Sequence, residues 1–267
     1  HRDLEMHRPE LALNFCNTGY GNHVSRQLHV PALLEMLEIP YVGADPKCMA
    51  ICHDKAMVMA AAGAAGVPVP RQHFIRVGRD PVPEIQDYPV MVKPNFGDGS
   101  VGVERDAVVH CADELRRCLQ RLAGEFTHPG VLIQDFLPGA EYSVGLIGAP
   151  ETGFVCLPPL EVDYSELGAD MPRILTHSSK VDPQSPYWRK VRLLRADVAA
   201  STRDNLQRWC RESFERLGCR DYARFDFRCG ADGQPRLIDV NAHPMWSAGG
   251  MMATMAGFAG YDYPRML

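Results

Sequence analysis

The sequence predicts a mixed fold in which an α/β unit leads into an α+β region. Two observations support this prediction. Single helices alternate with strands in the first part of the chain, and paired strands joined by turn residues gather toward its end. With 267 residues, of which 46% are apolar, the chain can bury a sizeable core.

The first elements are a short amphipathic helix over residues 31–37 and a strand over residues 39–43. A second helix, rich in Ala and Met, begins at Asp54 and ends near Gly66. Lys55 lies in its first turn, where the helix dipole is already positive. We therefore expect an anion to neutralise Lys55, with solvent as the alternative.

Residues 88–106 predict a strand, a glycine-rich turn and a second strand. Lys93 ends an apolar run, so its ammonium must reach solvent or meet an anion. The turn places Gly97 and Gly99 beside Ser100, and glycines let backbone N–H groups approach a phosphate closely. Because the order of residues is not that of a P-loop, the turn alone is weak evidence, and Lys93 strengthens it.

The next elements are a helix over residues 110–124, two strands within residues 130–148, and one strand over residues 153–163. A long helix follows over residues 197–217, with apolar residues at three- and four-residue steps and Gly218 as its stop. We expect this helix to pack on the hairpin that follows it.

In that hairpin, residues 224–244, Asp232-Gly233 predicts a two-residue turn whose central residues both need positive φ. The resulting register makes four opposed pairs: Asp226 with Asp239, Arg224 with Asn241, Phe225 with Val240, and Phe227 with Ile238. Since side chains alternate along a strand, one face is apolar and the other is polar.

Two opposed carboxylates repel each other unless a positive group lies between them. The oxygen ligands of Asp226, Asp239 and Asn241 suit Mg²⁺, which takes its remaining ligands from water and phosphates. The alternatives are an edge hairpin with one solvated face, or a longer loop that shifts the register.

The composition excludes several classes of protein. A net charge of −5 gives no field for nucleic acid or an anionic membrane, and no apolar run is long enough to span a bilayer. We therefore expect a cytoplasmic protein that binds neither. Nine irregularly spaced cysteines indicate reduced thiols, and Cys48 and Cys52 lack the partners of a zinc site.

Seven segments in order resemble the D-alanine–D-alanine ligase-like branch of the ATP-grasp superfamily: IPYVG, DKA, VMVKPNFGDGSVGV, VLIQDFLPGAEYSV, RILTHSSKVD, YARFDFR and LIDVNAHP. The resemblance covers nearly the whole chain. It implies an ATP-grasp fold in which two α+β lobes enclose ATP, preceded by a shortened N-terminal α/β lobe. It also implies an ADP-forming, ATP-dependent carboxylate-amine ligase that works through an acyl phosphate.

The resemblance assigns a role to each site residue. Those implied to bind ATP are Lys55, Lys93, Gly97, Gly99, Gln134, Asp135, Leu137 and Glu141, with Glu141 on the ribose. Asp226, Asp239 and Asn241 would hold two Mg²⁺ ions, for which Mn²⁺ can substitute. Arg224, Lys180 and Ser100 would serve the acyl phosphate and the transferring phosphoryl group.

The implied division is a remnant of an N-terminal lobe over residues 1–43, a central lobe over residues 44–130, and a C-terminal lobe over residues 131–267. The implied partners are a small-molecule carboxylate and an amino acid or other amine, and a homodimer is one expected assembly.

Some positions differ from the branch. Gly99 stands at the first position of a serine pair, Val181 replaces an aromatic residue, and HPMWSAGG over residues 243–250 replaces the usual Pro-Gly-Met-Thr segment. These changes predict a different substrate pair, whereas Asp239, where Glu is usual, keeps the charge of the metal ligand. The alternative function is a catalytically weak or truncated ATP-binding module that needs a partner, and a kinase is a third option. Trp246 either walls a pocket or packs in the core.

Overall fold

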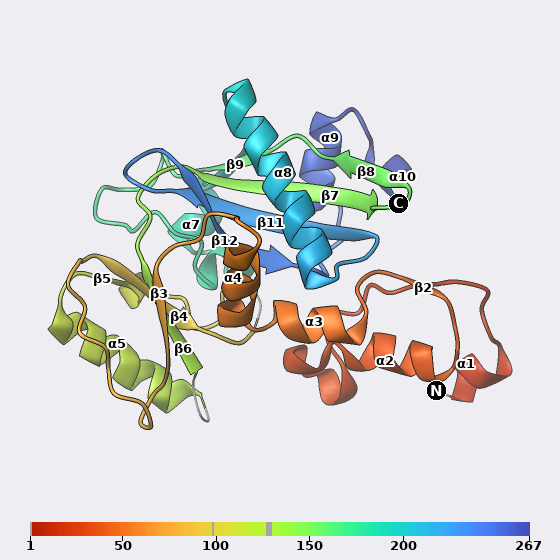
Figure 1. Ribbon diagram of the computed structural model, residues 1–267, viewed down its shortest axis with the longest axis horizontal. Coiled ribbons are helices and arrows are strands. Elements are labelled where there is room, and N and C mark those ends of the chain that lie inside the picture. Colours follow the sequence, from red (N-terminus) through yellow and green to blue (C-terminus); the bar gives the residue numbers. More distant parts are fainter. Residues whose placement is uncertain (1, 98, 127–129) are drawn as a thin grey trace.

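The computed structural model describes residues 2–97, 99–126 and 130–267, and its described strands form three sheets (Figure 1). A two-stranded parallel sheet joins β1 (Ala12–Leu13) to β2 (Tyr41–Val42). It lies among the elements that precede the ATP-grasp-like segments, namely α1 (Arg2–Met6), η1 (Tyr20–Asn22), η2 (Val24–Arg26) and α2 (His29–Met36). The helix and strand predicted for residues 31–43 are thus confirmed.

The second sheet has four antiparallel strands in the order β3-β6-β4-β5. Their bounds are β3 Gln72–Arg76, β4 Val90–Pro94, β5 Val108–Val109 and β6 Gly130–Asp135. Helix α5 (Ala112–Glu125) packs on this sheet, because Leu115, Leu119 and Leu122 repeat along its buried face and join a core with Val92 and Ile133.

The third sheet has six antiparallel strands, with the main order β10-β9-β7-β11-β12 and β8 paired to β7. Their bounds are β7 Glu141–Ala149, β8 Gly153–Cys156, β9 Leu160–Asp163, β10 Arg192–Arg195, β11 Tyr222–Cys229 and β12 Pro235–Asn241. Three short helices follow in the same part of the chain: α6 (Ser178–Val181) and α7 (Pro186–Lys190), which contact each other, and α10 (Tyr263–Met266).

Helices cover both faces of this sheet. On one face lie α3 (Pro46–Cys52), α4 (Lys55–Ala64) and α8 (Ala200–Leu217), which share a core with Phe225, Phe227 and Leu237 (Figure 1). Helix α9 (Met251–Phe258) covers the other face, where it approaches Gly145 so closely that a Cβ there would lie 2.9 Å from Met252 Sδ. The prediction that the long helix packs on the final hairpin is confirmed.

This packing differs from the predicted lobe of residues 44–130. Val58 and Met59 of α4 belong to the core of the six-stranded sheet, whereas β3, β4 and α5 form a separate core. Strand β6 extends the four-stranded sheet to Asp135, past the predicted boundary. Hydrophobic contact, and not sequence order, therefore decides to which sheet each helix belongs.

Two predicted strands are wrong in detail. The chain after the glycine-rich turn forms a 3₁₀ helix, η3 (Arg105–Ala107), and only then the two-residue strand β5, because Gly102 has a positive φ of +77°. The strand predicted over residues 153–163 is two strands, separated by Pro158 and Pro159, since proline cannot donate to a ladder. Among the described residues, no helix is long and apolar enough to cross a membrane.

Candidate active site

The hairpin of β11 and β12 carries the predicted polar face, but its turn is different from the prediction. The loop spans residues 230–234, and of the two predicted turn residues only Gly233 has a positive φ. Phe227 pairs with Leu237 and Asp226 pairs with Asp239, so Ile238 is an extra, bulged residue. The longer loop shifts the register by one residue and the bulge shifts it back.

Because of the bulge, one of the four predicted pairs is wrong, and the other three are confirmed. Leu237 takes the core position opposite Phe227, and Ile238 lines the cavity described below. Arg224 still faces Asn241, and Phe225 still faces Val240.

Asp226 is held by two neighbours. Arg224 donates from Nε to Oδ1 at 2.9 Å and from Nη2 to Oδ2 at 2.9 Å, which is a forked ion pair between largely buried side chains. Ser143 Oγ, opposite Asp226 on β7, donates to Oδ1 at 2.6 Å. Arginine therefore offsets part of the repulsion between the two opposed carboxylates.

Asp239 faces the lysines. Burial acts to raise the pKa of its carboxyl, but Lys55, Lys93 and Arg224 outweigh that effect and the pKa is lowered. Lys93 is 8% exposed and donates from Nζ to the Ile238 carbonyl at 3.1 Å. Burial lowers the pKa of Lys93 to about 8, although Asp239 acts in the opposite direction. The carbonyl of the bulged residue Ile238 thus holds the ammonium of Lys93 near the carboxylate of Asp239, a candidate metal ligand.

Lys55 links α4 to the glycine-rich turn. Asp54 caps α4 by accepting a hydrogen bond from Met57 N at 3.0 Å, and the next residue, Lys55, donates from Nζ to the Gly97 carbonyl at 2.5 Å. Gly97 and Gly99 have φ of +108° and +69°, and a Cβ at either would meet no atom within 4 Å. The space beside both glycines is therefore open, although Gly97 N already donates to the His53 carbonyl at 3.3 Å. Asp98 lies outside the described residues.

A cavity of about 130 Å³ gathers most of the predicted residues. Those that line it are Lys55, Lys93, Gly99, Ser100, Gln134, Asp135, Leu137, Glu141, Lys180, Asp226 and Asp239. Gly97 and Asn241 line a small neighbouring cavity together with Asp239, and Arg224 reaches the site through Asp226. Segments far apart in the sequence, from α4 to β12, therefore converge on one place.

One end of the cavity is largely apolar. Met91, Val103, Phe136, Leu137 and Ile174 line it beside Gln134. The side chain of Gln134 is buried and donates to Gln72 Oε1 at 2.8 Å, and that of Asp135 accepts from Arg71 Nε at 2.9 Å. Both side chains are thus engaged with β3 and its flank, which leaves the apolar walls of the cavity to meet a flat ring.

Glu141 belongs to a buried network that the sequence did not reveal. Its Oε2 accepts from Arg228 Nη1 at 2.7 Å and from Tyr164 Oη at 2.7 Å. Burial raises the pKa of Glu141, and Arg228 opposes that rise. Arg228 lies opposite Glu141 in the β7–β11 ladder and on the same strand face as Arg224 and Asp226, so its two-residue spacing was the available signal.

Lys180 lines the same cavity. It lies on α6, and the segment before it contacts the glycine-rich turn, because His177 N donates to the Val103 carbonyl at 3.1 Å and His177 Nδ1 lies 3.2 Å from the Gly99 carbonyl. These contacts hold the start of α6 against the turn.

Trp246 is half-buried and belongs to none of the buried core clusters among the described residues. Its ring packs edge to face on Tyr222 at 4.7 Å, and it also lines a surface cavity with Phe15, Asn17, His243 and Tyr263.

Mg²⁺ fits the donor set. Asp226, Asp239 and Asn241 offer carboxylate and amide oxygens at adjacent positions of one ladder, and Asn241 Oδ1 is oriented by a hydrogen bond from His243 N at 2.9 Å. ATP fits the lysines, the open glycines and the apolar end of the same cavity.

Three comparisons with known proteins agree. Residues 72–267 match the family model described as D-ala D-ala ligase C-terminus. The chain is 30% identical over 266 residues to the vancomycin/teicoplanin A-type resistance protein VanA of Enterococcus faecium, covering 99% of this chain and 69% of that protein.

Solved structures agree on the fold. A D-alanine–D-alanine ligase from Bacillus anthracis complexed with ATP has a TM-score of 0.74 and 20% identity, covering 99% of this chain and 79% of that one. The VanG D-Ala:D-Ser ligase of Enterococcus faecalis has a TM-score of 0.72 and 18% identity, covering 96% of this chain and 70% of that one. The predicted ATP-grasp fold is confirmed, and the chain belongs to the D-alanine–D-alanine ligase family.

Proposed function

We propose that the chain uses ATP to activate a small carboxylate and joins it to an amine or a related nucleophile, releasing ADP and phosphate. Membership of the ligase family supports the reaction class. The observation that carries the assignment of the site is the convergence of Lys55, Lys93 and Lys180 with Asp226 and Asp239 on one cavity.

The nucleotide lies between the two large sheets in this proposal. Lys55 and Lys93 bind its phosphates beneath the backbone of Gly97 and Gly99. The segment of residues 134–137 meets the adenine. Glu141 Oε2 is already bonded to Arg228 and Tyr164, so Oε1 is the oxygen that accepts from the ribose hydroxyls.

Asp226, Asp239 and Asn241 hold Mg²⁺, which neutralises charge on the transferring phosphoryl group when bound. Mn²⁺ substitutes because it accepts the same oxygen ligands. Arg224 is paired with Asp226, and in this proposal its positive charge steadies the reacting carboxylate.

The chemistry needs no covalent enzyme nucleophile. A carboxylate is a poor electrophile for an amine, so its oxygen first takes the γ-phosphoryl group and ADP leaves. The amine nitrogen then attacks the carbonyl carbon, and phosphate departs with the C–O bonding pair. Lys180, Ser100 and Arg224 position and stabilise the charge that develops in both steps.

The reaction class does not fix the identity of the second substrate, the nucleophile. The two similar structures are named for D-alanine and for D-serine as that substrate. In this chain residues 243–250 are HPMWSAGG, which differs from the segment usual in the branch. His243 and Trp246 of this segment line one surface cavity, and His243 N donates to Asn241, a proposed metal ligand. We propose that this segment selects a nucleophile other than D-alanine.

Phosphate release from Mg-ATP tests the proposal. The substrates are D- and L-amino acids and 2-hydroxy acids, offered singly and in pairs, with mass spectrometry of the products and the Asp239→Asn variant as the control. A specific pair should be required, and the product should be its amide or ester. A stable phosphorylated product formed without a nucleophile would indicate a kinase, and ATP binding without turnover would indicate the ATP-binding module.

A further inference from the structure

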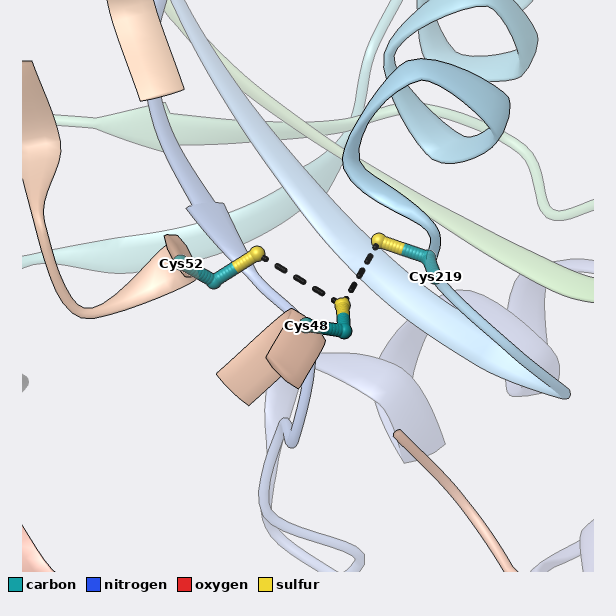
Figure 2. A group of neighbouring side chains, drawn as sticks. All are labelled: Cys48, Cys52 and Cys219. Atoms are coloured by element: carbon teal, nitrogen blue, oxygen red, sulfur yellow. Dashed lines mark hydrogen bonds between the residues drawn. The ribbon is translucent and has the colours of Figure 1, made fainter. Parts of the chain in front are cut away.

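Three buried cysteines meet outside the cavity (Figure 2). Cys48 and Cys52 lie one turn apart on α3, and Cys219 follows the end of α8. Cys48 Sγ lies 3.9 Å from Cys52 Sγ and 3.7 Å from Cys219 Sγ, and all three sulfurs lie within 4.8 Å of one another. The fold therefore brings together thiols that are 171 positions apart.

These distances are those of sulfurs around one metal ion. A metal–sulfur bond of about 2.3 Å places two thiolates of a trigonal or tetrahedral site about 3.8 to 4.0 Å apart. Both distances to Cys48 are close to this range, so the cluster needs little rearrangement to accept an ion.

We propose that Cys48, Cys52 and Cys219 bind one soft, thiophilic metal ion in three-coordinate geometry, with Cu(I) the ion that fits best. Thiolates select Cu(I) and zinc over hard cations. Among the described residues no fourth His, Cys, Asp or Glu joins the group, whereas structural zinc is held by four ligands. A three-sulfur set therefore favours an ion that needs only three.

An arriving ion would displace the protons of the three thiols, so that each sulfur binds as a thiolate. Entry is possible because Cys219 is 9% exposed and Cys52 lines a small cavity.

A bound ion would tie α3 to the turn between α8 and β11. The cavity at Cys52 is also lined by Asp239 and Asn241, so the ion would lie behind the proposed magnesium site. Since only the folded chain brings the three sulfurs together, binding stabilises the fold, and the stabilisation grows with the logarithm of the ion concentration over Kd.

Anaerobic titration of the reduced full chain with Cu(I), against a chromophoric Cu(I) chelator, tests the site. One equivalent should bind per chain, and Cys48→Ser or Cys219→Ser should each weaken binding more than about 100-fold. Cys118→Ser is the matched control, because Cys118 is buried on α5 outside the cluster, and it should leave the affinity unchanged. Equal affinity in Cys48→Ser would overturn the proposal.

A second measurement uses the unmodified chain, so it does not depend on the folding of a variant. Cu K-edge X-ray absorption of the loaded protein should count three sulfur neighbours. Two sulfurs, or nitrogen neighbours, would place the ion at other side chains such as the exposed Cys16 and Cys111 and would overturn the assignment. Zn²⁺ bound more tightly than Cu(I) would overturn the three-coordinate geometry.

Discussion

Arg228 and Glu141 face each other across the β7–β11 ladder, and Arg228 Nη1 lies 2.7 Å from Glu141 Oε2 with both side chains more than nine-tenths buried. A buried charge that loses its partner costs much more than an exposed one. We expect Arg228→Ala to lower the free energy of unfolding by about 3 to 5 kcal/mol.

Chemical denaturation checks this value. Arg192→Ala is the matched control, since Arg192 pairs with Glu166 at 3.3 Å on the surface, and it should cost no more than about 1 kcal/mol. Equal losses in the two variants would mean that the buried pair has no special role.

Asp239→Ala should reduce Mg²⁺-dependent turnover by at least about 100-fold, because the carboxylate is a proposed metal ligand. Steady-state phosphate release measures turnover, and circular dichroism checks that the variant is folded. Asp232→Ala, in the exposed hairpin loop, is the control and should keep full turnover. Unchanged turnover in Asp239→Ala would remove the metal assignment.

Lys93→Ala should weaken ATP binding by about 10- to 100-fold, because a charge-assisted hydrogen bond to phosphate is lost. Calorimetric titration with ATP measures the change. Lys190→Ala, on α7 away from the cavity, is the control. Equal affinity in Lys93→Ala would contradict the phosphate role.

The same lysine predicts a pH dependence. Its pKa of about 8 in the folded chain means that the ammonium is lost as the pH rises through that value, so ATP affinity should fall between pH 7 and pH 9. The unfolded chain keeps this proton up to about pH 10.4, so between about pH 8 and pH 10.4 it binds more protons than the folded chain. The contribution of Lys93 to the free energy of unfolding therefore rises with pH in that range. In Lys93→Arg the affinity should stay flat, and a fall as steep as in the wild type would assign the dependence to another group.

Gly102→Ala should cost about 2 to 3 kcal/mol of stability, because φ is +77° and the new Cβ would lie 2.6 Å from Pro94 Cγ. Gly99→Ala is the matched control: its φ is +69°, but the Cβ meets no atom within 4 Å, and the cost should be about 1 kcal/mol. Thermal unfolding of both variants compares them, and a larger loss at Gly99 would contradict the steric argument.

The sequence predicted the helices well, because caps and apolar spacing are local signals. Asp54 and Gly218 mark helix ends in the structure as they do in the sequence. The pairing of Asp226 with Asp239 was also right, although the predicted turn was wrong, because the bulge at Ile238 compensates for the longer loop. Such a compensation has no local signature.

What the sequence left open depends on which strands are neighbours. Ser143 and Glu141 meet Asp226 and Arg228 only because β7 lies beside β11, and hairpin patterning does not fix that order. The thiol cluster was missed for the same reason, since Cys219 joins Cys48 and Cys52 through tertiary packing.

The division of the cores also limits how this protein can be dissected. The family model matches residues 72–267, which do not include α4. Yet Val58, Met59 and Ala62 of α4 pack in the same core as the apolar residues of β11 and β12. A fragment that starts at residue 72 would expose that apolar surface to water and offer it to other copies of itself. We therefore expect residues 72–267 to need α4 in order to stay dispersed, so the segment that matches the family model is shorter than the unit that shares this core.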